Sequence, residues 1–323
     1  MDIEDYPRTI LEFEQCFSTE EACRGYLFQL RWPEGFCCPR CGHRQAWATK
    51  RGLYRCRHCD YQVSVTAGTI FQDTRKPLRL WFQAIWHVTS QKIGVSALGL
   101  QRVLGLPRYE TTWTWLQKLR VAMVRPGRDR LSGIIEVDET YIGGEKPGKR
   151  GRGAGGKALV MVAAQENEGH IGRIRLCRVP DASAESLSQA VKDTVEPGSM
   201  VRTDGWGGYG QLTSLGYVHA VVRETGEVGE NLLPLAHRAA SLLKRWLLGT
   251  HQGAVRASHL DYYLDEFTFR FNRRTSGSRG KLFYRLVQQA VQVQPVKGND
   301  LRGRCPNLMK HNIEGVREST GYP

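Results

Sequence analysis

Four cysteines are spaced as the ligands of a metal site are. Cys38 and Cys41 form one C-x-x-C pair, and Cys56 and Cys59 form a second pair after a gap of 14 residues. Four thiolates on two tight turns give the tetrahedral geometry that Zn²⁺ accepts, and four protein ligands leave no open position. The spacing therefore predicts a zinc ribbon with a structural Zn²⁺ ion. Two residues separate Cys38 from Cys41, whereas three separate Cys37 from Cys41, so Cys38 is the expected ligand.

Two aspartates end short apolar segments. Asp138 ends the segment IIEVD, and Asp204 ends the segment MVRTD. An aspartate in this position is often only a turn or cap residue. If three antiparallel strands come first and a helix then leads to the next strand, that strand lies beside the first, and the two carboxylates become neighbours. Neighbouring carboxylates repel one another and need a cation, and oxygen ligands suit Mg²⁺ or Mn²⁺.

A third ligand is expected on a helix that follows the last strand. Helix 234–248 has apolar residues at helical spacing, and its polar stripe holds His237 and Lys244. Seven residues are nearly two helical turns, so these two side chains share a face. We predict that His237 is the third metal ligand and that Lys244 contacts a substrate phosphate. Three other acidic residues are alternatives that rank below His237: Glu230, Asp261 and Asp265.

The segments that contain these residues resemble the DDE-type transposases of the ISXO-two-like (fifteen-ninety-five) family of bacterial insertion sequences. The resemblance covers roughly residues 15–292, and the zinc ribbon matches the head of that family. Its most specific segments are VDETYIGG (137–144), TDGWGGY (203–209), HRAASLLKRWLLGTHQG (237–253) and HLDYYLDEFTFRFNRR (259–274).

The resemblance implies a ribonuclease-H-like catalytic core that cuts and rejoins DNA. It implies two Mg²⁺ or Mn²⁺ ions at Asp138, Asp204 and His237, with Lys244 as the trailing lysine. Such ions activate water for strand cleavage and then the released 3′-hydroxyl for strand transfer. The implied partners are double-stranded DNA, both transposon ends and target, and further copies of the chain in a homo-oligomer. Two other functions stay open: a non-catalytic zinc-ribbon regulator derived from a transposase, and a hydrolytic metal-dependent nuclease.

The chain is predicted to consist of five segments, whose helices and strands hold these residues in place. From residue 133 the expected order is three strands, a helix, a strand, a short helix, a strand and a helix, which places the chain in the α/β class. Before it come the zinc ribbon and a helical region with a helix-turn-helix outline. The predicted segments are an N-terminal helical segment (1–35), the zinc ribbon (36–72), the helix-turn-helix-like DNA-binding region (77–126), the ribonuclease-H-like transposase catalytic domain (131–292) and a polar tail (293–323).

Composition indicates a polyanionic partner. The 323 residues include 46 Lys and Arg against 32 Asp and Glu, which gives a formal net charge of +14. Such an excess favours nucleic acid first and an anionic membrane surface second. No apolar run approaches the roughly 18 residues of a membrane span, and the N-terminus is acidic and polar, unlike a signal peptide. An odd number of cysteines argues against a disulfide scaffold. We therefore expect a cytoplasmic protein associated with the bacterial nucleoid and not with a membrane.

Nine basic side chains are predicted to contact DNA. Two lie at the second cysteine pair, two on the last helix of the helix-turn-helix-like region, three in a basic glycine-rich loop and two in a segment where aromatic and basic residues alternate. Basic groups on such surfaces suit phosphate contacts. They are Arg55, Arg57, Lys118, Arg120, Lys149, Arg150, Arg152, Arg273 and Arg274.

Overall fold

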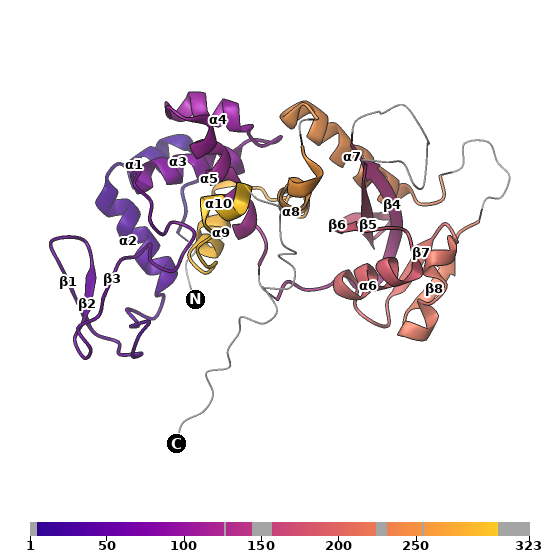
Figure 1. Cartoon of the computed structure of the whole chain (residues 1–323), viewed down its shortest axis with the longest axis horizontal. Helices are drawn as coiled ribbons and strands as arrows, with labels where there is room; N and C mark the ends of the chain where they lie inside the picture. Colours follow the sequence, from indigo (N-terminus) through magenta and orange to yellow (C-terminus); the bar gives the residue numbers. More distant parts are fainter. Residues whose placement is uncertain (1–4, 126, 144–156, 224–230, 254, 303–323) are drawn as a thin grey trace, which may run out of the picture. The chain divides into compact units, whose positions relative to one another are not determined.

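The computed structural model of the chain describes residues 5–125, 127–143, 157–223, 231–253 and 255–302 (Figure 1). The chain divides into two compact units. Unit 1 consists of Met1–Arg125 and Ser276–Gly303, and unit 2 consists of Pro126–Thr275 and Arg304–Pro323. The predicted span 131–292 is thus shared between the two units. Among the described helices, none is long and apolar enough to cross a membrane.

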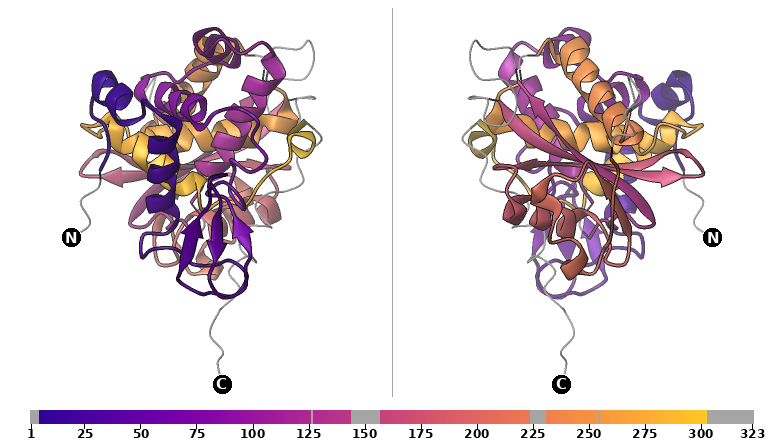
Figure 2. Two further views of the ribbon diagram at one scale, coloured as in Figure 1. Left: turned by 90° about the vertical axis from the view of Figure 1, so that its left-hand side faces the viewer. Right: turned by 90° about the vertical axis from the view of Figure 1, so that its right-hand side faces the viewer.

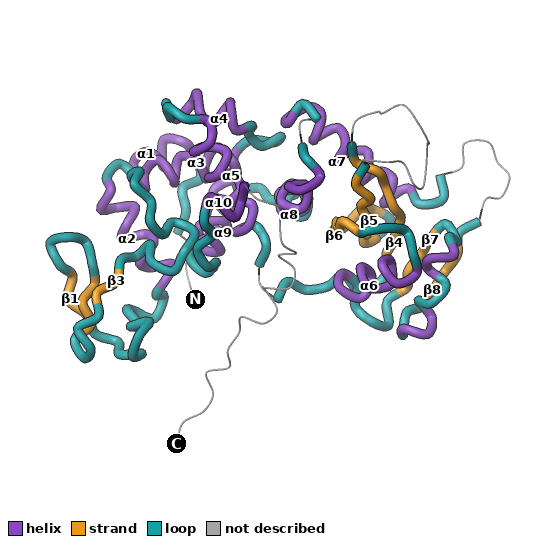
Figure 3. Tube along the Cα trace, viewed as in Figure 1, coloured by secondary structure: helices purple, strands orange, loops and turns teal. Residues whose placement is uncertain are grey.

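Unit 1 is mainly helical (Figure 3). Its N-terminal helices begin at threonine caps; Thr19, for example, accepts a hydrogen bond from the backbone N–H of Ala22, which satisfies one of the free donors of a helix start. Phe283, which is fully buried, contacts a ring of aromatic side chains: Phe13, Phe17, Phe82 and Trp86. The helices of unit 1 are α1 (Ile10–Cys16), α2 (Glu20–Arg31), α3 (Leu78–Ser90), α4 (Ala97–Leu104), α5 (Tyr109–Ala122), α9 (Arg279–Ala290) and α10 (Gly298–Arg302).

Three short strands form a separate small sheet in unit 1. They pair antiparallel in the order β1-β2-β3, and the left-hand view of Figure 2 shows them as short arrows. A sheet of this size buries too little apolar surface to be stable alone, so it needs a staple. The strands are β1 (Ala46–Ala48), β2 (Tyr54–Cys56) and β3 (Gln62–Val63).

Helices α4 and α5 follow one another through a short turn, and the helix-turn-helix itself stays a prediction. Gly105, at φ 61°, ends α4 in the left-handed conformation that favours glycine. A recognition helix presents one face to the major groove. Most of α5 is instead buried inside unit 1: Thr112, Thr114, Trp115, Leu116, Gln117, Leu119, Arg120 and Ala122.

Unit 2 contains a mixed five-stranded sheet in the order β6-β5-β4-β7-β8. The first three strands of the chain in this unit pair antiparallel, whereas β7 runs parallel to β4 and β8 parallel to β7. The prediction that the strand after the first crossover lies beside the first strand is therefore confirmed. The right-hand view of Figure 2 shows the twist of the sheet. The strands are β4 (Ile134–Ile142), β5 (Ala158–Asn167), β6 (His170–Val179), β7 (Met200–Thr203) and β8 (Val218–Val221).

Helices cover both faces of this sheet (Figure 1). Helix α6 (Ala184–Thr194) lies on one face, and α7 (Pro234–His251) and α8 (Leu260–Phe271) lie on the other. Side chains alternate along a strand. On β4, Ile135 and Val137 therefore join the core beneath α6. Glu136 and Asp138 lie on the opposite face of the strand, towards α7. The expected α/β class is confirmed.

Candidate functional site

The four cysteines converge as their spacing predicts. The Sγ atoms of Cys38 and Cys59 are 3.6 Å apart, as are those of Cys41 and Cys56, and all four lie within 4.8 Å of one another. Four sulfurs placed about 2.3 Å from a tetrahedral Zn²⁺ ion would be about 3.8 Å apart. The donor set therefore fits a structural zinc ion. Within the described part of the chain, this is the only group of three or more His, Cys, Asp or Glu ligand atoms that meets the 4.8 Å condition.

The two cysteine turns are built alike. In each turn the first cysteine donates its backbone N–H to the carbonyl five positions on, at 2.9 Å: Cys38 to His43 and Cys56 to Tyr61. Gly42, at φ 73°, provides the left-handed residue that closes the first turn. This geometry follows from local sequence, which explains why spacing alone could predict the site.

The surroundings of Cys56 favour the ionised form of its thiol. Burial raises the pKa of its thiol, but the backbone N–H groups of Cys59 and His58 and the neighbouring thiols lower the pKa to about 6. The N–H of His58 donates to the sulfur at 3.4 Å. Because the thiolate is the form that binds a metal, these donors favour metal binding.

Asp138 and His237 meet at the face of the sheet that α7 covers. Nε2 of His237 lies 3.2 Å from Oδ2 of Asp138, and the two side chains are 48% and 19% exposed. Nδ1 of His237 lies 2.6 Å from Oδ1 of Asn231, which can only accept a hydrogen bond. If the neutral ring carries its proton on Nδ1, Nε2 presents a lone pair to the carboxylate. Two facing lone pairs at this distance require a proton or a cation between them.

The distance itself suits a shared metal ion. Cis ligands at about 2.1 Å from an octahedral Mg²⁺ ion are about 3.0 Å apart. The 3.2 Å separation of Asp138 and His237 is close to that value. Imidazole is a poorer ligand than carboxylate for Mg²⁺, so a donor set that includes His237 suits Mg²⁺ less well than three carboxylates would.

Glu136 is a buried carboxylate beside the candidate site, and the sequence analysis did not single it out. Its Oε2 accepts the backbone N–H groups of Leu235 at 2.7 Å and of Ala236 at 3.0 Å, and the residue is 3% exposed. Burial raises the pKa of Glu136, whereas these two N–H groups lower it. Helix α7 has no side-chain cap of its own. A carboxylate two residues before Asp138 thus fixes the first turn of α7, and with it His237. The available signal was a glutamate on the same strand face as Asp138, between apolar residues.

Asp204 lies just beyond β7 in a tightly constrained turn. The β4–β7 register pairs Glu136 with Arg202, so Asp138 and Asp204 each lie two residues past that pair. Oδ1 of Asp204 accepts the backbone N–H of Trp206 at 3.0 Å. Gly205, at φ 81°, has no room for a Cβ atom, which would lie 2.6 Å from a side-chain carbon of β8. The segment TDGWGGY therefore fixes the position of an exposed carboxylate.

The structure brings two of the three predicted ligands together at short range. Asp138 and His237 are adjacent, but Asp204 does not lie within 4.8 Å of both. Lys244 is exposed on α7, on the same helix as His237. The role of all four residues in catalysis stays a prediction.

The alternative third acids lie elsewhere. Asp261 forms a 2.9 Å ion pair with Arg178, and Asp265 lies 3.7 Å from Arg128. Both carboxylates therefore already interact with a guanidinium. Glu230 lies outside the described residues.

A cavity of about 710 Å³ lies next to the histidine of this pair. His237 contributes to its wall, together with Arg238 and Ser241 of α7 and with Arg274 and His170. Two guanidinium groups and a hydroxyl are groups that bind phosphate oxygens. The lining of the cavity is therefore suited to a phosphate-bearing ligand next to the Asp138–His237 pair.

The predicted DNA contacts near the zinc ribbon have surface positions. Arg57 is exposed and its guanidinium lies 5.4 Å from the ring centre of Trp47, whereas Arg55 forms a 2.9 Å ion pair with Asp60. These positions suit phosphate contacts, which stay a prediction. Three predicted contacts lie outside the described residues: Lys149, Arg150 and Arg152.

The predicted contacts on α5 point inward. Arg120 is 1% exposed, and Nζ of Lys118 donates to the carbonyl of Ile70 at 3.3 Å. Burial lowers the pKa of Lys118. A side chain that is buried in its own unit cannot reach a phosphate, so Arg120 has no place in the proposed DNA surface.

Arg273 and Arg274 both hold unit 2 together. The guanidinium of Arg273 donates to the carbonyl of Phe269 at 3.2 Å and lies over its ring. That of Arg274 lies over the ring of Phe271 and donates to backbone carbonyls at the start of β6. These contacts give both residues a structural role, and Arg274 also contributes to the wall of the cavity.

The fold and its sites define a two-unit α/β protein with a zinc ribbon in one unit and an acidic site on a mixed sheet in the other. Residues 130–272 match the ISXO2-like transposase domain, and residues 18–62 match the transposase zinc-ribbon domain. Both matches are to transposase domain families, as the resemblance predicted. The strand order β6-β5-β4-β7-β8 agrees with the implied ribonuclease-H-like core.

Individual proteins are similar to the chain over different lengths. A protein of Halobacterium salinarum described as an uncharacterized protein in transposable element ISH50 is 29% identical over 280 residues, which cover 79% of this chain and 91% of that protein. The catalytic core domain of BIV integrase aligns at 17% identity and a TM-score of 0.32, over 46% of this chain and 89% of that one. A chain of a simian T-cell lymphotropic virus intasome aligns at 15% identity and a TM-score of 0.30, over 57% and 70%.

Proposed function

We propose that this chain is a DNA transposase and that unit 2 performs metal-dependent DNA strand cleavage and strand transfer. The observation that carries the proposal is the close approach of Asp138 and His237, whose oxygen and nitrogen face each other at 3.2 Å. A metal cation can bridge these two atoms as a proton can, and the pair lies within the residues that match the transposase domain.

Asp138, Asp204 and His237 would hold two Mg²⁺ or Mn²⁺ ions. When bound, such ions lower the pKa of water or of a 3′-hydroxyl and neutralise charge on the leaving oxygen. The protein itself positions the reacting groups, because in-line phosphoryl transfer requires no covalent protein intermediate. Glu136 fixes α7 against β4, and Lys244 with the cavity beside His237 binds the phosphates of the strand.

Double-stranded DNA is the proposed partner of the whole chain. A net charge of +14 favours a polyanion. Exposed basic side chains of the zinc ribbon, such as Arg57, would contact the phosphates of transposon ends. We propose that the chain acts as a homo-oligomer on paired ends, since strand transfer joins two ends to one target.

The test separates catalysis from DNA binding. Asp138→Ala and Asp204→Ala should each reduce strand transfer of transposon-end DNA by on the order of 100-fold or more, because each removes a ligand of ions that carry the reaction. End binding, measured by gel shift without divalent metal, should stay near the wild-type level. Strand transfer is measured with Mg²⁺ and with Mn²⁺.

Asp193→Ala is the matched control, because Asp193 is an exposed carboxylate on α6 and lies on the other side of the sheet. It should leave strand transfer unchanged. Near-normal strand transfer by either Asp138→Ala or Asp204→Ala would overturn the proposed centre. Cleavage without joined products by the wild-type chain would instead indicate a hydrolytic nuclease.

A further inference from the structure

Strand β8 packs against the turn that carries Asp204. It pairs parallel to β7 in a register that places Val221 opposite Thr203. A Cβ atom added to Gly205 would lie 2.6 Å from Cγ1 of Val221, so β8 directly contacts the residue that follows Asp204. Side chains alternate along a strand, so His219 lies on the same face of β8 as Val221. Strand β8 therefore offers two side chains to this turn.

A buried threonine hydroxyl connects His219 to the same turn. Oγ1 of Thr203, which is 0% exposed, lies 2.9 Å from Nε2 of the half-buried His219. The same oxygen accepts the backbone N–H of Gly205 at 3.2 Å. Burial lowers the pKa of His219, which favours the neutral ring. If that ring carries its proton on Nδ1, Nε2 accepts the hydroxyl proton of Thr203, and the lone pairs of the hydroxyl stay available to Gly205.

These hydrogen bonds limit the freedom of the backbone at Asp204. The N–H of Gly205 belongs to the planar peptide group that begins at the carbonyl of Asp204, so its bond to Thr203 fixes the orientation of that group. The next peptide N–H, that of Trp206, donates to Oδ1 of Asp204 at 3.0 Å. The indole of Trp206 donates in turn to the carbonyl of Ala182 at 2.9 Å. The carboxylate of Asp204 is therefore attached to a backbone that is held on both sides.

We propose that His219 and Thr203 are positioning residues of the metal site, which hold the turn so that the carboxylate of Asp204 keeps the orientation of a metal ligand. The inference rests on the proposed function, in which Asp204 is a ligand. Contacts of this kind, outside the ligand set itself, orient the ligands of other metal sites and increase their affinity. His219 acts on Asp204 through the hydroxyl of Thr203, so the effects of the two residues depend on one another.

Mn²⁺ affinity of the zinc-loaded full chain tests the proposal. Electron paramagnetic resonance measures free Mn²⁺ during titration of the wild type, Thr203→Val, His219→Phe and their double variant. Thr203→Val removes the shared hydroxyl and should weaken Mn²⁺ binding by about 10-fold or more, as loss of such contacts does. His219→Phe should weaken it by a smaller factor, because the hydroxyl still accepts the N–H of Gly205. Adding His219→Phe to Thr203→Val should cause no further loss, and fully additive losses would overturn the dependence of His219 on Thr203.

Conservative variants and a control separate this role from a merely structural one. Thr203→Ser keeps the hydroxyl, and His219→Gln keeps a polar atom near the position of Nε2, so both should bind Mn²⁺ nearly as tightly as the wild type. Thr194→Val is the matched control, because Thr194 is also buried in unit 2 and its hydroxyl donates to the carbonyl of Ala190 at 2.7 Å. This variant should unfold at a lower denaturant concentration and bind Mn²⁺ normally. Equal losses of affinity in Thr203→Ser and Thr203→Val would contradict the role of the hydroxyl.

Asp204→Ala distinguishes failure of the metal site from failure of the positioning role. If this variant keeps the Mn²⁺ affinity of the wild type, Asp204 is not a ligand and the proposed metal site fails. If Asp204→Ala loses affinity while Thr203→Val and His219→Phe bind as tightly as the wild type, the metal site stands and the positioning role is overturned. Should Thr203→Val fail to fold, His219→Phe and His219→Gln decide the question, because they change a side chain that is only half-buried.

Discussion

The buried carboxylate of Glu136 connects a strand to the helix that carries a proposed metal ligand. Both of its observed hydrogen bonds come from the first turn of α7, at Leu235 and Ala236. A carboxylate at a helix N-terminus also meets the positive end of the helix dipole. Because His237 follows in the next residue, the geometry of the Asp138–His237 pair also depends on Glu136.

Glu136→Ala is therefore expected to affect both stability and the site. It leaves two buried N–H groups without an acceptor, which should lower the free energy of unfolding by about 2–4 kcal/mol. Glu136→Gln keeps an acceptor oxygen and should lose only about 1 kcal/mol. Urea unfolding of the two variants measures the difference. Equal losses in the two variants would show that the hydrogen bonds to α7 are not the main contribution.

Among the helices and strands of unit 2, the end of α8 provides a side chain that hydrogen bonds to the edge of the sheet. Strand β6 is the edge strand, and an unpaired edge exposes backbone donors and acceptors. Oδ1 of Asn272 accepts the N–H of Ile174 at 2.8 Å, and Nδ2 donates to the carbonyl of the same residue at 3.0 Å. Asn272 thus pairs with β6 as a neighbouring strand would.

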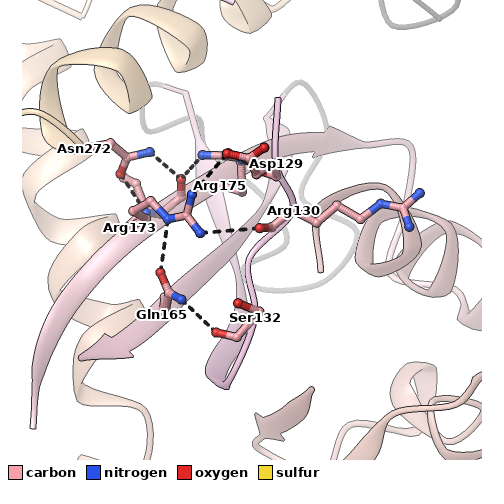
Figure 4. A network of polar contacts seen from close by, with 8 residues as sticks. Asp129, Arg130, Ser132, Gln165, Arg173, Arg175 and Asn272 are labelled. Carbon is pink, nitrogen blue, oxygen red and sulfur yellow. Dashed lines mark hydrogen bonds and ion pairs between the residues drawn. The ribbon is translucent and has the colours of Figure 1, made fainter. Parts of the chain in front are cut away.

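The contact of Asn272 extends into a larger polar network (Figure 4). Next to Ile174, the guanidinium of Arg175 donates to the carbonyl of Asp129 at 2.6 Å, which joins β6 to the segment that leads into β4. Burial lowers the pKa of Arg175 to about 10. The network therefore connects three elements that are far apart in the sequence.

Asn272→Ala should release this edge. Loss of both hydrogen bonds is expected to lower the free energy of unfolding by about 2–3 kcal/mol and to increase the amide exchange rate at Ile174. Hydrogen-exchange and urea measurements check the two effects. Asn167→Ala, at an exposed end of β5, is the control and should change stability by less than about 0.5 kcal/mol. Unchanged exchange at Ile174 in Asn272→Ala would contradict the pairing.

Each of the two units of the chain has its own hydrophobic core. The first and last parts of the described chain build unit 1 together, since Phe283 of α9 packs among aromatic residues of α1 and α3. The sheet of unit 2 has separate apolar clusters on its two faces. The zinc ribbon belongs to unit 1 only.

Zinc removal should therefore act on one unit. A structural zinc site contributes folding free energy directly, because the unfolded chain has no preformed site. Calorimetry with a chelator should lower the thermal transition of unit 1 and leave that of unit 2 in place. Cys38→Ser should reproduce the effect and lose the bound zinc. Cys37→Ser is the matched control, and a loss of zinc in that variant would show that the ligand was assigned to the wrong cysteine.

Features that depend on local spacing could be predicted from the amino-acid sequence. Two C-x-x-C pairs form a metal-binding group because the turn around each pair closes within six residues, as from Cys38 to His43. The strand order around β4 was predicted from the order of the elements, three antiparallel strands and then a helical crossover to a strand beside the first. The family resemblance followed from segments that the matched domains contain.

Which polar and charged side chains are buried, and which groups they contact, became clear from the packing of the elements. Glu136, Tyr209 and Arg120 look like ordinary polar residues in the sequence, but packing removes each of them from water. Their partners, where the structure shows them, lie far along the chain, as Glu136 and Leu235 do. The periodicity of apolar residues in a sequence describes one helix or strand at a time. Burial depends on which helices and strands pack together, so the burial of these residues could not be predicted from the sequence.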